Sequence, residues 1–395
     1  MLPEVTQAPV RETFLPFGQA DLGEAEFNEV IDTLRSGWLS VGPKTREFES
    51  RFKEYVGSKH ALAVNSCTSA LHLALVAAGI GEGDEVITSP VTFCATANVV
   101  VHQRGKPVLA DISPDDYNLD PAKIEERLTP RTKAIIPVHF AGQPCRMDEI
   151  LEIARRHNLL VIEDAAHAVG AVYKGRPVGT LGDVTAFSFY ATKNLTTSEG
   201  GALTTENDDL AARMRTLSLH GMSRDAWQRY TAKGSWYYEV VAPGYKYNMT
   251  DIEAALGLHQ LRRLEQFNTT RARYAAMFTE AFSTLPEIQT PAVRPDVKHA
   301  WHLYAIRLRP GTLKIDRAQF IDELKARNIG ASVHFIPVHL HPFYQQAFGY
   351  KAGDYPVAES YFEGAVSLPL YPRMTEADVV SVIEAVQDII HHHRR

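Results

Sequence analysis

Apolar and polar residues follow two different patterns along the chain. From residue 60 to about residue 190, short apolar runs typical of buried strands are separated by amphipathic stretches with helical periodicity. This alternation predicts an α/β fold with a mostly parallel central sheet and helices on both faces. The strands are expected at residues 61–65, 85–88, 108–111, 134–138, 159–163 and 186–189, and the helices between them at 68–78, 92–102, 121–128 and 147–157.

The rest of the chain lacks this alternation. Two long helices are predicted around a polar, aromatic-rich stretch, and a smaller unit of strands and helices follows Pro286. The helices are expected at residues 24–34, 208–219, 250–267, 316–327 and 376–390, the aromatic-rich stretch at 224–247, and further strands at 302–308 and 332–335. We therefore expect two domains, a large α/β domain over residues 1–265 and a smaller C-terminal α+β domain over residues 266–395.

Composition and charge exclude several classes of protein. The 395 residues are 45% apolar, which is enough for buried cores, and the net charge of −6 lacks the basic excess of a nucleic-acid binder. Three cysteines without a CxxC pair predict neither a disulfide framework nor a metal site, and the C-terminal HHHRR is typical of a solvated end. No apolar stretch reaches the roughly 18 residues of a membrane span, and residues 1–17 do not contain the basic region and apolar core that are typical of a signal peptide. We expect a cytoplasmic protein that binds no nucleic acid, membrane or metal.

Two segments place reactive side chains just after predicted strands, where open α/β sheets bind their ligands. In VIEDAAHAVG, Asp164 follows a strand and precedes His167. A carboxylate there can hold a cationic ring nitrogen, but an aspartate that caps the next helix would give the same pattern. In AFSFYATKN, Ser188 lies near a strand end and Lys193 in the turn that follows. A partly desolvated lysine can form a Schiff base, and a solvated surface lysine is the plain alternative.

Two further segments offer different chemistry. In NSCTSALHLAL, the hydroxyl groups of Ser66, Thr68 and Ser69 surround the first turn of a predicted helix, which suits a bound anion and equally an ordinary helix cap. In SPVTFCATAN, Phe93 follows a strand and either stacks on a flat ring or belongs to the core. Taken together, the four segments require a ligand with a phosphate, an aldehyde, a basic ring nitrogen and a flat face. Pyridoxal phosphate has all four.

These segments resemble the sugar aminotransferases of the DegT/DnrJ/EryC1/StrS family, which are pyridoxal phosphate enzymes of fold type I. The similar segments are SGWLSVGPKTREFE, EGDEVITSPVTF, VIEDAAHAVG, FSFYATKN with SEGG, PGYKYNMTDIEAALG and HAWHLYAIRL. The resemblance covers roughly residues 14–390. It implies the fold type I architecture for nearly the whole chain.

The resemblance also implies a role for each candidate residue. Lys193 would form the Schiff base, Asp164 would pair with the ring nitrogen, and His167 would lie near the ring oxygen or the aspartate. The contacts to the phosphate and to the two ring faces would come from Cys67, Thr68, Ser69, Ser188, Phe93 and Ala166. Cys67 stands where the family usually has glycine or alanine, so a backbone contact is expected there.

The family is typically dimeric, and a segment of the neighbouring subunit closes each site. The common form of that segment is G-Y-N-Y-R, whereas this chain has G-Y-K-Y-N at residues 244–248. Lys246 and Asn248 are two residues apart and would face the same way in an extended segment, so they could present a donor pair to the phosphate. With residues 133–142 and 165–175, this segment most resembles UDP-4-amino-4-deoxy-L-arabinose aminotransferases.

By the same resemblance the reaction is a two-stage transamination. L-Glutamate would convert pyridoxal phosphate to pyridoxamine phosphate and leave as 2-oxoglutarate, and the amino group would then pass to a keto carbon, expected at C-4, of a nucleotide-linked sugar. Candidates for contacts with the sugar or diphosphate are Trp38, Tyr190, Arg224, Arg229, His334 and His339.

Three other functions share part of this sequence pattern. A related pyridoxamine-dependent sugar dehydrase has histidine in place of the lysine, so Lys193 argues against it. A non-catalytic regulator would use the fold only to bind cofactor or sugar nucleotide. Such a function does not explain why Lys193, Asp164 and Ser188 are all present. A nicotinamide-dependent dehydrogenase could share the alternating sheet, but no GxGxxG follows the first strand.

Overall fold

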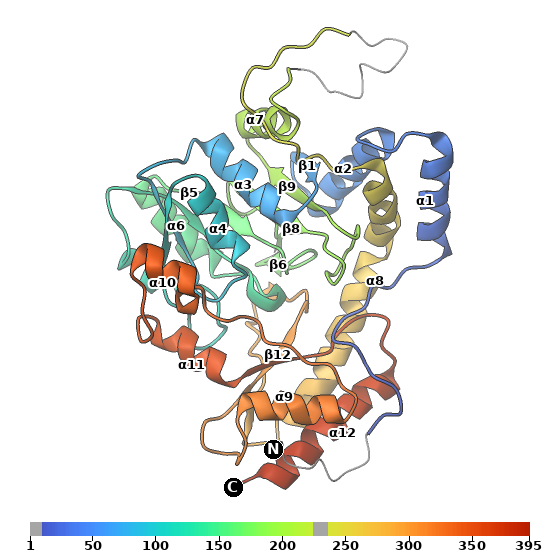
Figure 1. Ribbon diagram of the computed structural model, residues 1–395, viewed down its shortest axis with the longest axis vertical. Helices are drawn as coiled ribbons and strands as arrows, with labels where there is room; N and C mark the ends of the chain where they lie inside the picture. The colour runs from blue at the N-terminus through green and yellow to red at the C-terminus, as the bar shows by residue number, and fades with distance from the viewer. Residues whose placement is uncertain (1–9, 224–235) are drawn as a thin grey trace.

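The computed structural model describes residues 10–223 and 236–395. In this part of the chain, seven strands form a central sheet in the order β1-β9-β8-β5-β4-β2-β3 (Figure 1). The strands are β1 (His60–Val64), β2 (Glu85–Thr88), β3 (Lys106–Leu109), β4 (Thr132–Ile136), β5 (Leu160–Asp164), β8 (Val184–Ser188) and β9 (Gly201–Thr205). Among these seven, β9 runs antiparallel to both of its neighbours, and the others are parallel to one another. The predicted α/β fold with a mostly parallel sheet is confirmed.

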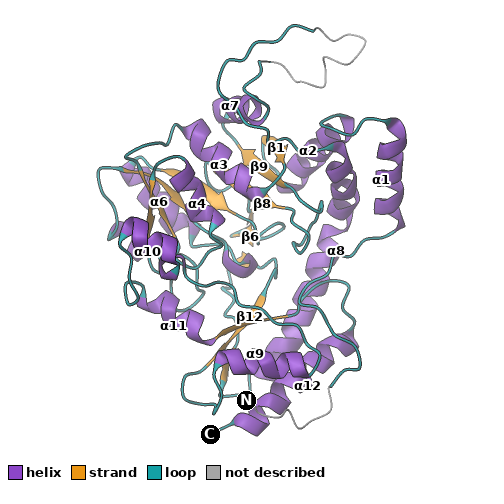
Figure 2. Cartoon of the chain, viewed as in Figure 1, coloured by secondary structure: helices purple, strands orange, loops and turns teal. Residues whose placement is uncertain are grey.

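Helices cover both faces of the sheet (Figure 2). The helices described between residues 24 and 282 are α1 (Glu24–Ser36), α2 (Pro43–Val56), α3 (Cys67–Ala78), α4 (Ala95–His102), α5 (Pro121–Glu125), α6 (Met147–His157), α7 (Asp208–Ser218) and α8 (Asp251–Phe282). Alternate residues of the strands point to opposite faces, so β1 gives Leu62 and Val64 to the core under α3, α4 and α7, and Ala61 and Ala63 to the core under α2, α6 and α8.

A second core lies at the C-terminal end of the chain. The antiparallel sheet β10-β12-β13 packs there with α9, α12 and the last turns of α8 (Figure 1). The elements of this region are β10 (Ile288–Gln289), β12 (Tyr304–Leu308), α9 (Arg317–Ala326), α10 (Pro342–Phe348), α11 (Pro356–Gly364), β13 (Ala365–Leu368) and α12 (Glu376–His393). The boundary expected at residue 265 lies within the continuous helix α8, which contributes Leu264 to the first core and Tyr274 to the second. The division into two domains stays a prediction.

The predicted strands of the large sheet lie within two residues of the observed ones, but other elements differ. The strand expected at residues 332–335 is wrong, because Ser332 forms a single bridge to Ser367 and β13 supplies the third strand of the small sheet. Helix α2 and strand β9 were not predicted. A small sheet of β6 (Val172–Tyr173), β7 (Arg176–Pro177) and β11 (Val297–Lys298) was not predicted either.

Residues 10–223 and 236–395 contain neither a membrane-spanning helix nor a cluster of metal ligands. Within these residues there is no helix both long and apolar enough to cross a bilayer. In the same residues, no three histidine, cysteine, aspartate or glutamate side chains are grouped so that they could hold a metal ion.

Candidate active site

The segments singled out in the sequence meet at one edge of the sheet. Asp164 is the last residue of β5 and Ser188 is the last residue of β8, and these two strands are paired neighbours. Strands β1 and β2, which β9 and β4 separate from this pair in the sheet, lead into the turn before α3 and into the segment that carries Phe93. Because the carboxyl ends of parallel strands lie together, side chains far apart in sequence form one site.

Asp164 is a buried carboxylate with neutral hydrogen-bond partners. Its Oδ2 accepts a hydrogen bond of 2.7 Å from the Thr96 hydroxyl, and its Oδ1 accepts one of 3.1 Å from the backbone N–H of Ala166. Burial raises the pKa of Asp164, since the charged form loses its hydration, and these hydrogen bonds act in the opposite direction. A cationic group placed beside it would therefore be strongly favoured.

The preceding residue, Glu163, points to the other face of the strand. Its two oxygens accept hydrogen bonds from His139 at 2.8 Å, from the Thr185 hydroxyl at 2.6 Å and from the backbone of Gly182 at 2.8 Å. The carboxylate is completely buried in these contacts. Glu163 is thus part of the framework, and of the two neighbouring acids Asp164 faces the site.

Lys193 lies in the turn after β8, where its backbone N–H donates to the carbonyl of Tyr190. Its amine lies 3.4 Å from Nε2 of His302. Desolvation lowers the pKa of Lys193 to about 8, and the nearby positive charge of Arg271 acts in the same direction. A much larger fraction of neutral amine exists near neutral pH than for a solvated lysine, which is what nucleophilic attack on an aldehyde requires.

The turn before α3 presents hydroxyl and backbone donors. Ser66 caps the helix by accepting a hydrogen bond of 3.1 Å from the backbone N–H of Ser69, and the Ser69 hydroxyl donates to Asn65. The first N–H groups of a helix have no partner within the helix, and the Thr68 side chain is exposed above them. A Cβ on Gly201 would lie 2.7 Å from the backbone nitrogen of Cys67, so the close packing of β9 under this turn requires glycine. An anion fits this arrangement of donors.

Phe93 and Ser188 complete the wall of the site. Phe93 is 61% exposed, so the alternative that it belongs to the core does not hold. Its ring lies 6.1 Å from that of Phe335, measured between centroids. The Ser188 side chain is buried, and its hydroxyl oxygen lies 3.4 Å from the backbone nitrogen of Tyr190. Both residues lie where a flat ring with a phosphate group could contact them.

His167 is buried beside these residues. Its ring lies 4.4 Å from that of His302 and stacks on Phe335 at 5.8 Å, both measured between centroids. Its Nδ1 has no hydrogen-bond partner among the described residues, which is costly for a buried polar atom. Burial and the charge of Lys193 lower the pKa of His167 well below 6.5. A neutral imidazole with one unsatisfied nitrogen is suited to a polar atom of a ligand.

The model of the DegT/DnrJ/EryC1/StrS aminotransferase family matches residues 20–387 of this chain. The chain belongs to this family. It is similar to the uncharacterized protein MJ1066 of Methanocaldococcus jannaschii, with 57% identity over 98% of this chain and all of that protein. It is also similar to the spore coat polysaccharide biosynthesis protein SpsC of Bacillus subtilis, with 56% identity over 96% of this chain and 98% of that protein.

Among solved structures, the sugar aminotransferase Spr1654 of Streptococcus pneumoniae in its PMP form superimposes with a TM-score of 0.90. The identity is 35%, and the match covers 96% of this chain and 99% of that one. A PLP form of the same protein superimposes with a TM-score of 0.89. The resemblance to the DegT/DnrJ/EryC1/StrS family that the motifs indicated is therefore confirmed.

The family's segment 244–248 is held against the rest of this subunit. The backbone N–H of Asn65 donates to the carbonyl of Tyr247 at 2.8 Å, and the rings of Tyr245 and Tyr247 stack at 4.9 Å beside His72. The side chains of Lys246 and Asn248 are hydrogen-bonded to each other at 2.5 Å. They lie on the same side of the segment, and the site role predicted for them stays a prediction.

The other candidates for sugar contacts lie in different environments. Tyr190 is half-exposed, and the ring of His334 stacks on Phe17 at 5.4 Å. The indole of Trp38 donates to the carbonyl of Val41. His339 is completely buried and bonded to Glu359, so it faces a core. Arg224 and Arg229 lie outside the described residues.

Four polar residues of the site were not singled out in the sequence. Thr96 binds Asp164, His302 lies beside the amine of Lys193, and Asn194 and Arg271 contact His302. His302 lies within the HAWHLYAIRL segment that carries part of the family resemblance, and Asn194 directly follows the lysine. These two positions could have identified His302 and Asn194 as site residues from the sequence. The sequence around Thr96 and Arg271 gives no such indication.

Proposed function

We propose that this protein is a pyridoxal phosphate-dependent aminotransferase that moves an amino group from L-glutamate to a keto carbon, at C-4, of a nucleotide-linked sugar. The observation that carries the proposal is that a buried carboxylate, Asp164, and a desolvated amine, Lys193, lie at one edge of the sheet. The carboxylate suits a pyridinium nitrogen and the amine suits an aldehyde. Pyridoxal phosphate supplies that aldehyde and a ring that withdraws electrons from the amino donor.

Residues of this chain would bind the cofactor and transfer the proton. Lys193 would hold the cofactor covalently and, when the amino donor displaces it, its free amine would carry a proton from the donor's α-carbon. Asp164 would keep the ring nitrogen protonated. Cys67 through its backbone, with Thr68, Ser69 and Ser188, would bind the phosphate, whereas Phe93 and Ala166 would pack on the two ring faces. The free Nδ1 of His167 would meet the ring oxygen.

The comparisons support a sugar substrate. The Spr1654 structure is described as a sugar aminotransferase, and SpsC is a polysaccharide biosynthesis protein. A nucleotide as the carrier and C-4 as the acceptor carbon are proposed from the likeness of residues 133–142, 165–175 and 244–248 to UDP-4-amino-4-deoxy-L-arabinose aminotransferases. We place the protein in the cytoplasm, where glutamate and nucleotide sugars are available.

A panel assay tests the proposal directly. The holoenzyme is incubated with L-glutamate and a set of UDP- and dTDP-linked 4-keto sugars, and the products are followed by mass spectrometry. The expected result is one amino sugar nucleotide formed in equal amount to 2-oxoglutarate. Loss of a sugar hydroxyl without 2-oxoglutarate would indicate a dehydrase, and cofactor binding with no turnover on any sugar would favour a regulator.

The rate at which the apoprotein captures pyridoxal phosphate is expected to rise with pH through a midpoint near about 8. The neutral amine of Lys193 is the nucleophile, and its lowered pKa makes that form abundant at lower pH than for an ordinary lysine. The measurement is the absorbance of the bound cofactor after rapid mixing. Nα-acetyl-lysine, titrated in parallel, corrects for ionisation of the cofactor itself. A midpoint near 10 would contradict a desolvated amine.

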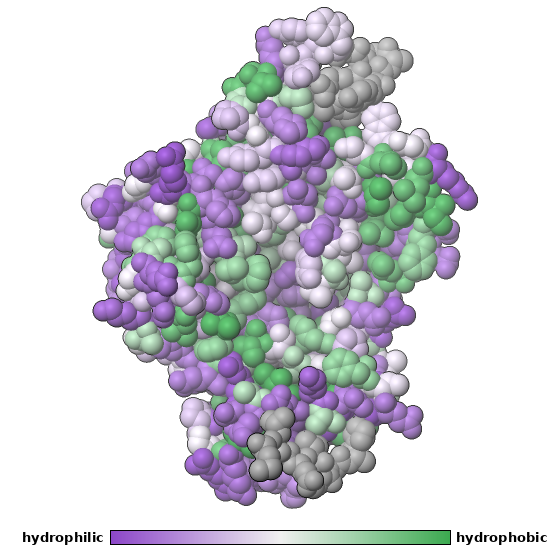
Figure 3. Space-filling view, viewed as in Figure 1, coloured by the Kyte–Doolittle hydropathy of each residue, from purple (hydrophilic) through white to green (hydrophobic). Residues whose placement is uncertain are grey.

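We further propose a homodimer in which Lys246 and Asn248 reach the site of the neighbouring subunit. Exposed apolar residues support an interface. Trp236 is 85% exposed, and Phe27, Ile31 and Leu34 lie along one exposed side of α1, where Figure 3 shows a hydrophobic patch. Patches of this kind mark protein contacts.

Mixing two impaired variants tests the shared site. Lys193→Ala and the double variant Lys246→Ala/Asn248→Ala are each expected to be nearly inactive alone. If the segment serves the neighbour, a mixed dimer has one intact site, and random mixing restores about a quarter of the parent activity. The measurement is turnover after unfolding and refolding the two variants together. If the segment serves its own subunit, mixing restores nothing.

A further inference from the structure

His302 lies beside the amine of Lys193 and has no role in the function proposed above. Its Nε2 lies 3.4 Å from the Lys193 amine, at the long end of hydrogen-bonding range, and its Nδ1 lies 3.1 Å from Oδ1 of Asn194. A neutral imidazole has one N–H and one lone pair. The nitrogen that carries the hydrogen therefore decides whether His302 can accept a hydrogen bond from Lys193.

A backbone carbonyl and a side-chain amide oxygen determine the orientation of Asn194. Its amide nitrogen donates to the carbonyl of Ala300 at 2.6 Å and to Oδ1 of Asn268 at 2.8 Å. Asn268 is oriented in turn, because its own amide nitrogen donates to the carbonyl of Val169 at 3.1 Å. Carbonyl oxygens only accept hydrogen bonds, so both N–H groups of Asn194 are used and its oxygen must face His302.

The tautomer of His302 follows from this chain of contacts. Its Nδ1–H donates to Asn194, and the lone pair of Nε2 is left facing the amine of Lys193. Burial lowers the pKa of His302 well below 6.5, and the charges of Lys193 and Arg271 lower it further. The ring is therefore neutral and able to accept.

The backbone of His302 is held as firmly as its ring. Arg271 is buried and donates to the carbonyls of His302 at 3.2 Å, Trp301 at 3.3 Å and Leu370 at 2.6 Å. On the other side, Gly142 has a φ of +105°, and a Cβ there would lie 3.1 Å from the nitrogen of His302 and 2.9 Å from the carbonyl of His167. Only glycine allows this close approach.

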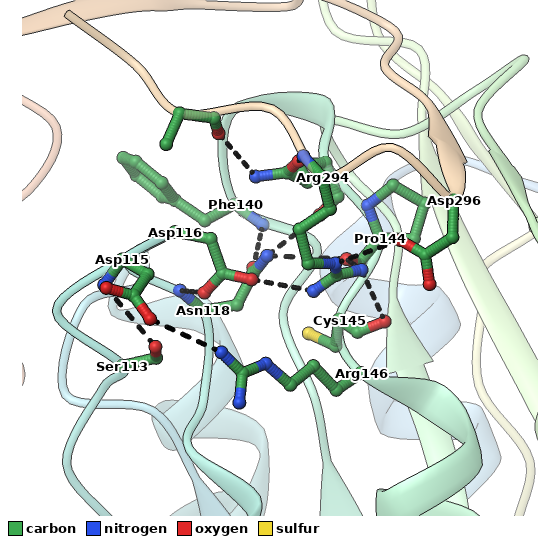
Figure 4. A network of polar contacts seen from close by, with 12 residues as sticks. Ser113, Asp115, Asp116, Asn118, Phe140, Pro144, Cys145, Arg146, Arg294 and Asp296 are labelled. Carbon is green, nitrogen blue, oxygen red and sulfur yellow. Dashed lines mark hydrogen bonds and ion pairs between the residues drawn. The ribbon is translucent and has the colours of Figure 1, made fainter.

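A polar network fixes the turn that contains Gly142. Figure 4 shows Arg294 bonded to Asp116 and to the carbonyls of Pro144 and Cys145, and Asn118 accepting from the backbone of Phe140. The backbone carbonyls of this turn accept hydrogen bonds from the backbone N–H groups of residues 300 and 303, on either side of His302. Contacts from three separate segments therefore hold His302 in place: Lys193 with Asn194, Arg271, and the turn of Gly142.

We propose that His302 is a positioning residue that accepts a hydrogen bond from Lys193 and thereby aims the lone pair of the free amine into the site. The proposal rests on the proposed function, because the lysine amine is free only when it is not bonded to the cofactor. When one N–H of the amine is bonded to His302, the lone pair of the amine points away from His302. It can then attack an aldehyde or accept a proton. Asn194 and Asn268 act through His302.

The first test reads the tautomer in the apoprotein. With ¹⁵N-labelled histidine, the NMR signals of His302 are expected to show a protonated Nδ1 and an unprotonated Nε2. The signals are identified by their loss in His302→Phe or, should that variant not fold, by their shift in Lys193→Ala, which removes the donor and keeps the ring. A protonated Nε2 in the parent protein would overturn the proposal.

The second test measures capture of pyridoxal phosphate by folded apoprotein. His302→Phe and Asn194→Ala are each expected to slow capture about tenfold, close to the worth of one hydrogen bond. Because both act on one contact, the double variant should be no slower than His302→Phe. His299→Phe is the matched control, since His299 is a buried histidine of the same segment that bonds the backbone of Trp301.

Two outcomes contradict the proposal. Capture by folded His302→Phe within twofold of the parent rate would exclude a positioning role, and additive losses in the double variant would exclude a shared contact. Neither readout depends on turnover of a sugar. If the tautomer and the capture rates are as expected but no sugar is aminated, the proposed function fails and the role of His302 stands.

Discussion

Replacing Lys193 by alanine is expected to abolish the absorbance of the lysine-bound cofactor and to lower amino transfer by at least about 10⁴-fold, the upper range for loss of a positioned acid–base group. Alanine can neither bond to the aldehyde nor carry the proton of the donor's α-carbon. The absorbance spectrum of the loaded protein and the yield of 2-oxoglutarate from glutamate measure the two effects separately. Full turnover in this variant would overturn the assignment of Lys193.

The same substitution is not expected to destabilise the apoprotein. The pKa of Lys193 is lowered because its charged form is desolvated, so at neutral pH the folded state bears a cost that alanine removes. Its amine has one long hydrogen bond to lose. Lys298→Ala is the matched control, since this lysine forms a surface ion pair with Glu265 at 2.8 Å. The control should keep the cofactor spectrum and the activity.

The large sheet could be predicted from the sequence because its buried strands are continuous apolar runs that alternate with amphipathic helices. Two of the errors have local causes. Strand β9, GALTT at Gly201–Thr205, contains one large apolar residue, so it is recognisable as a strand only through its pairing with β1 and β8. The residues at 332–335 have a strand-like composition but find a partner at one position only.

The site divides in the same way. Asp164, Ser188 and Lys193 could be found because each lies at the end of a strand or in the turn directly after it. The contacts that support them could not be predicted, because each joins distant parts of the chain. Thr96 reaches Asp164 across 68 residues, and His302 reaches Lys193 across 109. The periodicity of apolar residues gives no information on contacts between residues so far apart in the sequence. These supporting contacts can therefore be identified only from the structure.

Replacing Asp164 by asparagine is expected to lower amino transfer by on the order of 10²–10³-fold, the range seen when one preorganised electrostatic group is lost. The neutral amide cannot hold a proton on the ring nitrogen, so the ring would withdraw electrons less well. Asparagine has the same shape and can still bond Thr96 and the backbone of Ala166. Because burial already disfavours the charged carboxylate, the stability of the apoprotein should not fall. Single-turnover kinetics with glutamate and urea unfolding measure the two quantities.

The neighbouring acid provides the control, because Glu163 lies on the same strand and faces the framework. Three donors, from His139, Thr185 and Gly182, point at its two oxygens. Glutamine would replace one accepting oxygen by an N–H₂ group and leave a buried donor unpaired, at a cost of about 1–3 kcal/mol in the free energy of unfolding. Glu163→Gln should therefore lose stability and keep the cofactor spectrum. Asp164→Asn should keep its stability and change the cofactor spectrum. Equal effects of the two substitutions on the chemical step would contradict the assignment of Asp164 to the ring nitrogen.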